Sequence, residues 1–409
     1  MPSSKGKSLI SREWLREMVH QLILAKEPIT SSSSRGVPSS CQGLIVSGGN
    51  GCGKTTFLKS LIWNNFDQFG SGLRDKISRA VLSFQFCCTA DIETLSVAKF
   101  VLNMAAKLVD NDEFSSYTKQ ISESSDIREY INSVSAEKDP ETAFREGILK
   151  PLNKLFQEDS FSSHGGLKQY VFLVDLPDHD CTSCAAHECI ASLLAANMAY
   201  FPKWIKLVIT GTKRSLQALL ATEKLHEVAL DNIANWDVQR DIYSFAETSL
   251  HKVSADEMST AKIRKLVDNI VTLSKGSFHV ATAAIQYVTI SFASLRKQPV
   301  LMSLDVNSLL SETFKLVFGT TERKRILAVS ILDILYASQQ SFTASCLYKT
   351  IENGCSSQVV TFQEFESCME KLGASQMISE SNEGRIYLTE LARSWLVVDG
   401  KAIAGFNVR

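Results

Sequence analysis

The sequence predicts an α/β protein: a parallel sheet in a three-layer arrangement with helices, followed by a helical lid and a winged-helix module. Three observations predict it. Short apolar runs alternate with helical patterns up to residue 235, a glycine-rich segment joins one of these runs to a helix, and the rest of the chain is mostly helical. The expected domains are an N-terminal helix and linker (1–40), an α/β core (41–235), a helical lid (236–320) and a winged-helix-like domain (321–409).

The composition is that of an ordinary globular protein. Of 409 residues, 44% are hydrophobic and 21% are charged, and 43 Lys and Arg balance 44 Asp and Glu. The net charge of −1 argues against a protein that acts on nucleic acid or anionic lipid through a global electrostatic field. The N-terminus lacks the apolar core of a secretory signal, so the ten cysteines are expected to be reduced thiols in the cytoplasm.

The elements of the core follow from the spacing of apolar residues. Continuous apolar runs indicate buried parallel strands, and apolar residues three or four apart indicate helices. Strands are predicted at 43–47, 80–86, 170–176, 205–211 and 226–230, and helices at 11–25, 57–66, 92–109, 141–157 and 186–200. The polar stretch 110–140 is expected to be a helical excursion from the core.

The rest of the chain is predicted to be a helical bundle followed by a winged helix. Its helices are expected at 237–250, 260–274, 277–295, 306–318, 323–339, 344–353, 361–372 and 389–397, and its strands at 375–379 and 385–388. Three helices followed by a β-ribbon are typical of a winged helix. The uncharged stretch between Lys275 and Arg296 is long enough to span a bilayer, but its His, Gln, Ser and Thr favour a buried helix, so no transmembrane segment is expected.

The strongest functional signal is a phosphate-loop motif. The segment Gly48-Gly49-Asn50-Gly51-Cys52-Gly53-Lys54-Thr55 matches G-x-x-x-x-G-K-[ST] between a predicted strand and a predicted helix. The glycines let backbone N–H groups surround a phosphate, Lys54 can reach the β- and γ-phosphates, and the Thr55 hydroxyl can bind Mg²⁺. Thr56 follows at the helix N-terminus, which favours an anion. The sequence therefore predicts a P-loop NTPase core with ATP or ADP and Mg²⁺ as cofactors.

Further candidate residues follow the third and fourth predicted strands. Asp175, near the end of the third strand, is predicted to hold Mg²⁺ through water. Asp178 and His179 are the candidates for orienting the attacking water, and a turn of helix-capping aspartates is the alternative. Thr210, near the end of the fourth strand, is a candidate sensor of the γ-phosphate.

A group of Cys and His residues follows the same strand. Cys181 and Cys184 have the spacing of half a zinc site, and His187 or Cys189 could add ligands. Structural zinc sites normally take their two ligand pairs from separated segments, whereas these residues follow one another almost at once. A loop of capping and small residues beside the nucleotide site is therefore favoured, and zinc is the alternative.

Several blocks of the sequence resemble TANC-type scaffold proteins. After the phosphate loop come FQFCCTADIETLSVAKFV (84–101), DPETAFREGILKPLNKL (139–155), YVFLVDLPDHD (170–180) and FPKWIKLVITGTK (201–213). The match also includes SREWLREMVHQL (11–22), SKGSFHVATAAIQYV (274–288) and ILAVSILDILYASQQSFTASCLYKTIENG (326–354). On this resemblance the chain is identified as the STAND-class, NACHT-like ATPase region of an ankyrin-repeat, tetratricopeptide-repeat (TPR) and coiled-coil protein. A large ankyrin-repeat protein with a similar ATPase is the alternative.

The resemblance implies a cytoplasmic scaffold at the postsynaptic density or the cell cortex. Its partners would be scaffold, cytoskeletal or synaptic proteins, with self-association also expected, and the chain would be a portion of a longer repeat protein or a short isoform. Two departures from the family put hydrolysis in doubt. His179 stands at the position of the family's catalytic Glu, although Asp175 is kept, and Thr212 stands where the family has Arg.

Taken together, these features predict an ATP/ADP-binding regulatory module of a scaffold protein, with weak or no hydrolysis. The alternative is an active ATPase that remodels or oligomerises a protein partner. A nucleic-acid-binding ATPase is disfavoured because the predicted recognition helix, TFQEFESCMEKL (361–372), is net acidic. No nucleic-acid partner is therefore expected.

Overall fold

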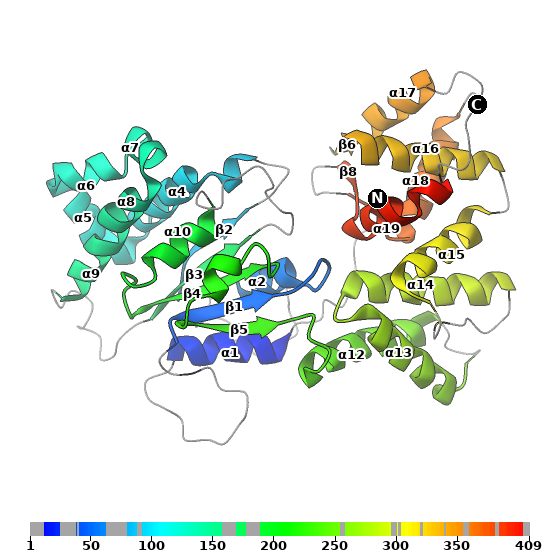
Figure 1. The fold of residues 1–409 in the computed structure, drawn as a ribbon, viewed down its shortest axis with the longest axis horizontal. Helices are drawn as coiled ribbons and strands as arrows, with labels where there is room; N and C mark the ends of the chain where they lie inside the picture. The colour runs from blue at the N-terminus through cyan, green and yellow to red at the C-terminus, as the bar shows by residue number, and fades with distance from the viewer. Residues whose placement is uncertain are drawn as a thin grey trace. The chain divides into compact units, whose positions relative to one another are not determined.

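The chain folds into two compact units (Figure 1). The first contains the chain up to Gly49 and from Gly53 to Leu230, and the second contains Asn50–Cys52 and the chain from Asp231 onward. This computed structural model describes residues 12–24, 38, 41–62, 80–87, 92–157, 169–176, 189–253, 258–295, 301, 304–319, 322–338, 341–354, 360–380 and 384–403. Each unit has a hydrophobic core of its own.

The first unit is built on a five-stranded parallel sheet, which confirms the predicted fold class. In the order β2-β3-β4-β1-β5, its strands are Val81–Phe86, Tyr170–Asp175, Ile205–Gly211, Gly43–Ser47 and Leu225–Ala229. All neighbouring pairs are parallel. Every residue of the three inner strands is buried, whereas both edge strands are partly exposed. This burial explains why the inner strands have continuous apolar sequences.

Helices cover both faces of the sheet and complete the three layers (Figure 1). On one face, Phe172 and Leu207 share a core with Phe100, Leu152 and Leu194. These last three residues lie on α4 (Val97–Val109), α9 (Lys150–Gln157) and α10 (Ile190–Asn197). The other face is covered by α1 (Glu13–Leu24) and α2 (Lys54–Ile62), while η1 (Ile92–Leu95) and α11 (Gln217–Leu220) lie in the connections.

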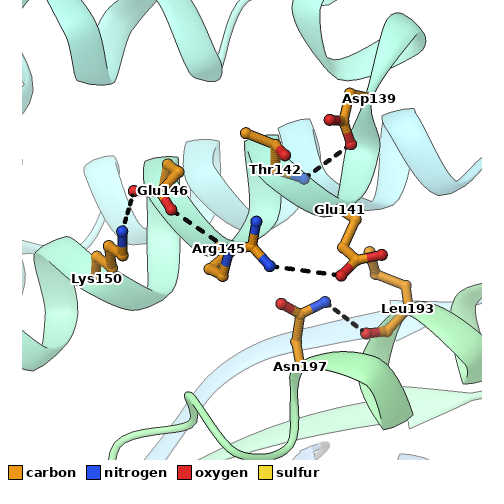
Figure 2. Close-up of polar contacts among 8 residues, drawn as sticks. All are labelled: Asp139, Glu141, Thr142, Arg145, Glu146, Lys150, Leu193 and Asn197. Atoms are coloured by element: carbon orange, nitrogen blue, oxygen red, sulfur yellow. Dashed lines mark hydrogen bonds and ion pairs between the residues drawn. The ribbon is translucent and has the colours of Figure 1, made fainter.

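The polar stretch after α4 is a series of short helices with side-chain caps. They are η2 (Asp112–Phe114), α5 (Ser115–Glu123), α6 (Ser125–Tyr130), α7 (Ser133–Lys138), α8 (Pro140–Phe144) and the π-helix η3 (Arg145–Leu149), which runs into α9. Ser124, Asn132 and Asp139 each accept a hydrogen bond from the backbone N–H three residues later. Figure 2 shows the Asp139 cap, with Arg145 paired to Glu141 at 3.6 Å farther along. These local bonds explain how a sequence poor in apolar residues forms helices.

The second unit begins with four helices that match the predicted bundle closely. They are α12 (Trp236–Val253), α13 (Thr260–Ser274), α14 (Phe278–Leu295) and α15 (Val306–Phe318). The uncharged stretch that could have spanned a bilayer is α14, and its Ala281, Ala284 and Val288 lie in the core of this unit. Within the described residues, no helix combines the length and hydropathy needed to cross a membrane.

The winged-helix module completes the second unit. Its elements are α16 (Glu322–Ser338), β6 (Phe342–Thr343), α17 (Ala344–Gly354), α18 (Phe362–Ala374), β7 (Ile378–Glu380), β8 (Arg385–Leu388) and α19 (Glu390–Ile403). The strands form an antiparallel sheet in the order β6-β8-β7. Trp395 on α19 donates a hydrogen bond from Nε1 to the hydroxyl of Ser311 on α15 at 2.8 Å, so the module and the helical bundle share one core.

Candidate nucleotide-binding site

The phosphate-loop motif lies between β1 and α2, as its sequence pattern requires. At the start of the loop, the Ser47 hydroxyl donates to Glu227 on β5 at 2.6 Å, and the Gly48 N–H donates to the Gly211 carbonyl on β4 at 3.2 Å. The loop leads directly into α2, whose first residue is Lys54. The loop is therefore fixed to both neighbouring strands at one end and to a helix N-terminus, a favourable place for an anion, at the other.

Two loop glycines have backbone conformations that favour glycine. Gly51 has a φ of 74° and Gly53 a φ of 82°, both in the left-handed region. At Gly51 there is also no room for a side chain, because a Cβ would lie 2.6 Å from Cγ of His279. These glycines let the chain turn tightly between the strand and the helix.

Lys54 is folded into the loop instead of extending into solvent. Only 4% of the residue is exposed, and its Nζ donates to the carbonyls of Gly48 at 2.9 Å and Gly49 at 2.8 Å. The loop thus holds a positive charge beside the first turn of α2, where Thr55 and Thr56 are half-buried. An ammonium group in this position can neutralise a bound phosphate.

Asp175 and Thr210 meet at the carboxyl edge of the sheet. Strand β4 lies between β1 and β3, and the register places Thr210 opposite Val46 on one side and Asp175 on the other. Thr210 is fully buried, Asp175 is 2% exposed, and the Thr210 hydroxyl donates to Oδ1 of Asp175. The predicted metal residue and the predicted γ-phosphate sensor are therefore hydrogen-bonded to each other. Val46, which is paired with Thr210 in the sheet, lies two residues before the start of the loop at Gly48.

The tip of the phosphate loop belongs to the second unit and is held there by hydrogen bonds. The Ser277 hydroxyl donates to the Asn50 carbonyl at 3.1 Å, and the Phe278 N–H donates to the Gly51 carbonyl at 2.9 Å. Neither Ser277 nor Phe278 is predicted from the sequence to contact this segment. Ser277 carries a helix-start signal, since it immediately precedes the helical pattern of α14, but that signal does not show what the serine contacts.

Several candidates lie outside the described residues: Asp178, His179, Cys181, Cys184 and His187. The remaining cysteine of that group, Cys189, is the N-cap of α10, and its Sγ accepts a hydrogen bond from the Ser192 N–H at 3.4 Å. Among the described residues, no group of three or more His, Cys, Asp or Glu side chains is arranged to hold a metal ion.

Thr212 also has a structural partner. Its hydroxyl accepts a hydrogen bond from the Ser215 N–H at 3.2 Å, and the Thr212 carbonyl accepts one from the Leu216 N–H at 3.0 Å. These bonds close the turn between β4 and α11.

Comparisons with known proteins connect the chain to solved ATPase structures only distantly. No family model matches it. The Walker-type ATPase PABY2304 of Pyrococcus abyssi is 12% identical, with a TM-score of 0.37 over 97% of this chain and 98% of its own. The ORC2 protein of Aeropyrum pernix, solved with ADPNP and ADP, is 12% identical, with a TM-score of 0.34 over 99% and 97%. Cdc6p of Pyrobaculum aerophilum is 11% identical, with the same TM-score and coverage. Similarities this low carry no inference about activity.

These comparisons correct the family predicted from the sequence. The assignment to a TANC-type scaffold is wrong: no family model matches, and the similar solved structures are archaeal Walker-type, ORC and Cdc6 proteins. The expected ankyrin and tetratricopeptide repeats, scaffold role and postsynaptic location depended on that resemblance, and they are withdrawn with it.

Proposed function

We propose that this chain binds ATP or ADP with Mg²⁺ at the phosphate loop and acts as a nucleotide-dependent regulatory module. The observation that carries the proposal is the loop itself, with its left-handed Gly51 and Gly53 and a buried Lys54 between a buried strand and a helix N-terminus. Backbone N–H groups of the loop would bind the phosphates, and Lys54 would neutralise them.

The side chains that would hold the metal suit a hard cation. Mg²⁺ prefers oxygen ligands and usually keeps several waters. Thr55 offers a hydroxyl next to the loop, and Asp175 offers a carboxylate whose orientation is fixed by Thr210. We assign Thr55 to direct contact with Mg²⁺ and Asp175 to contact through water. Thr210 would orient Asp175 through its hydrogen bond, and it would also lie toward the γ-phosphate.

The proposal concerns binding and not turnover. Hydrolysis needs a residue that orients the attacking water, and both candidates, Asp178 and His179, lie outside the described residues. The alternative of an active ATPase that acts on a protein partner is tested directly by single-turnover phosphate release. Release that is abolished in Lys54→Ala would favour it.

Binding is tested by calorimetric titration with Mg-ADP and Mg-ATP. A hydrogen bond to a charged group contributes about 1.5–3 kcal/mol, so Lys54→Ala should weaken binding about 10- to 100-fold. Lys203→Ala is the matched control, because Lys203 is exposed at the opposite end of β4 and its removal changes the net charge equally. Equal affinity of both variants, or the absence of any binding or heat stabilisation of the wild type, would contradict the proposal.

A nucleic-acid partner stays outside the proposed function. The exposed side of α18 carries Glu366 and Glu370, which repel a phosphate backbone. Titration with duplex DNA at low and at physiological salt tests this expectation. Binding that weakens steeply as salt is raised would overturn it.

A further inference from the structure

A carboxylate on the edge strand β5 contacts the residue that precedes the phosphate loop. The Ser47 hydroxyl donates to Oε1 of Glu227 at 2.6 Å. Ser47 is fully buried and is the last residue of β1, directly before the loop. Both residues belong to the first unit, as do Gly48, Gly49 and Lys54. The contact therefore lies within one unit, next to the residues that would bind phosphate.

The side chain of Glu227 extends toward the carboxyl edge of the sheet. The register pairs Glu227 with Ile45, and Ser47 follows Ile45 by two residues on the same face of β1. A side chain that starts opposite Ile45 and accepts from Ser47 has to extend in the direction of the loop. Glu227 is exposed, and Ser47 uses one of the about four acceptor positions of a carboxylate. The same carboxylate can therefore accept further hydrogen bonds while it holds Ser47.

The order of the strands separates the two ends of a bound nucleotide. Strand β1 leads into the loop and lies between β4 and β5. Thr210 and the proposed metal residue Asp175 are on the β4 side, so the γ-phosphate and Mg²⁺ belong there. A chain of phosphates that passes over β1 then carries the nucleoside away from them, toward β5. Neighbouring strands are about 4.8 Å apart, so β5 lies roughly 10 Å from Thr210, a span that a polyphosphate can cross.

The chemistry of β5 suits the sugar of a nucleotide. Glu227 and His226 are its two polar side chains, and His226 is paired with Leu44, which places it on the opposite face of the sheet from Glu227. A carboxylate repels phosphate, but it accepts hydrogen bonds from hydroxyl groups. An acidic side chain that binds ribose hydroxyls is the solution used by dinucleotide-binding folds. The ligand that Glu227 fits is therefore a sugar with two adjacent hydroxyls.

These contacts, together with the proposed nucleotide site on which this step rests, assign a ligand to Glu227. We infer that Glu227 is a specificity residue that accepts hydrogen bonds from the 2′- and 3′-hydroxyls of the ribose of ATP or ADP. Ser47 is its positioning residue, because the buried hydroxyl holds one carboxylate oxygen while the carboxylate receives the ribose. The site thereby favours a ribonucleotide over a nucleotide that lacks these hydroxyls.

The first test compares Mg-ADP with Mg-2′,3′-dideoxy-ADP in calorimetric titrations. A hydrogen bond to a charged group corresponds to a factor of about 10 to 100 in an equilibrium constant, and the exposure of Glu227 to water favours the lower end. Wild type should therefore bind Mg-ADP about 10-fold more tightly than the dideoxy nucleotide. Glu227→Ala should bind the two within about 2-fold of each other, the scatter expected when the interaction is absent.

Two control variants separate recognition of the ribose from support of the loop. Ser47→Ala removes the same 2.6 Å hydrogen bond but keeps the carboxylate, so it should retain a preference for Mg-ADP of about 3-fold or more. Glu223→Ala removes an equal charge from an exposed residue two positions before β5. It should keep the preference of wild type.

A milder variant and two further nucleotides test the same contact without removing the side chain. The amide oxygen of Glu227→Gln can still accept from Ser47, but a neutral hydrogen bond corresponds to a factor of only about 2 to 10. This variant should prefer Mg-ADP about 2- to 3-fold, between wild type and Glu227→Ala. In wild type, 2′-deoxy-ADP and 3′-deoxy-ADP each keep one hydroxyl and should bind with intermediate affinity.

The outcomes distinguish the inference from the proposed function. If wild type binds neither nucleotide, the proposed function fails and the inference fails with it. If wild type binds Mg-ADP and the dideoxy nucleotide equally well, the inference is overturned while the nucleotide site stands. Weakening of both nucleotides by the same factor in Glu227→Ala would also overturn it, because the carboxylate would then support only the loop. Complete loss of the preference in Ser47→Ala would lead to the same conclusion.

Discussion

At the scale of single residues, the contact between Thr210 and Asp175 links two adjacent inner strands at the site. Thr210→Val keeps the shape of the side chain and removes the hydroxyl that donates to Asp175. Because both residues are buried, the carboxylate loses a donor that water cannot easily replace, and we expect a loss of about 1–3 kcal/mol in the free energy of unfolding. Urea unfolding at neutral pH measures this loss.

Thr313→Val provides the comparison for that prediction. Thr313 is also fully buried, but its hydroxyl donates to the Leu309 carbonyl at 2.7 Å, one turn earlier in the same helix. Its acceptor is a backbone carbonyl and not a carboxylate, so the cost should be no more than about 1 kcal/mol. A smaller loss for Thr210→Val than for Thr313→Val would show that the Thr210–Asp175 contact is not a stabilising one.

Local sequence predicted the loop residues of the site but not how they pair with the rest of the chain. The fold places Lys54 and the loop glycines between β1 and α2, because the motif and its flanking elements are contiguous. The pairing of Asp175 with Thr210 depends on β4 lying between β1 and β3, and strand order is a long-range property. Ser277 contacts Asn50 across more than two hundred residues, so no local pattern could have identified it.

At the scale of elements, the π-helix between α8 and α9 depends on a buried tyrosine. Four residues after Gly147 comes Pro151, which has no N–H to donate, and the Gly147 carbonyl accepts a 2.9 Å hydrogen bond from the Tyr117 hydroxyl. Tyr117 is fully buried. Tyr117→Phe should therefore lower the free energy of unfolding by about 0.5–1.5 kcal/mol at neutral pH.

The same residue predicts a dependence on alkaline pH. Burial raises the pKa of Tyr117 above its ordinary value of about 10. The folded state thus keeps a proton that the unfolded chain loses, so the stability from this group is fully present below about pH 10 and falls as the pH rises further. Tyr117→Phe should show a shallower decline than wild type in urea unfolding from pH 7 to about pH 11. Parallel curves would contradict this role.

Tyr170→Phe is a second check on the same effect. Burial, followed by the 2.7 Å hydrogen bond to Glu113, raises the pKa of Tyr170 as well, so this variant should also flatten the decline. The Tyr170 hydroxyl donates to Glu113, whereas the Tyr117 hydroxyl donates to Gly147 in the π-helix. Only Tyr117→Phe should therefore weaken the η3 turn, which hydrogen exchange of residues 145–149 would report.

Element by element, the sequence predicted periodic segments well and interrupted segments poorly. The helices α13 and α15 have the predicted bounds, because their apolar residues repeat at helical spacing without a break. The predicted helix 141–157 is instead α8, a π-turn and α9, since apolar spacing does not reveal a one-residue bulge. The two-residue strand β6 was not predicted, because it is too short to produce a pattern.

At the scale of the whole molecule, the incorrect family assignment has a physical explanation. Two of the blocks that supported it contain β3 and β4, in which every residue is buried. Any inner strand of a parallel sheet needs a continuous apolar run of this kind. Such runs therefore indicate the fold, but they do not indicate which other domains a protein contains. Fold does not imply function, and a scaffold role needed evidence beyond these segments.

The two separate cores lead to a final prediction about the whole chain. Because the two units have separate cores, calorimetry should resolve two unfolding transitions. Leu173→Ala and Leu332→Ala, which truncate buried side chains in the first and second unit, should assign them by lowering one transition each. Mg-ADP at about 100 times its dissociation constant adds about 2.7 kcal/mol of stability.

That stabilisation should appear in the transition of the first unit of wild type. Lys54, Gly48 and Gly49 belong to this unit, so its unfolding would disrupt the loop and release the nucleotide. In Lys54→Ala, Mg-ADP at the same concentration should leave the transition unshifted. A first transition that Mg-ADP does not raise in wild type would contradict nucleotide binding at the loop.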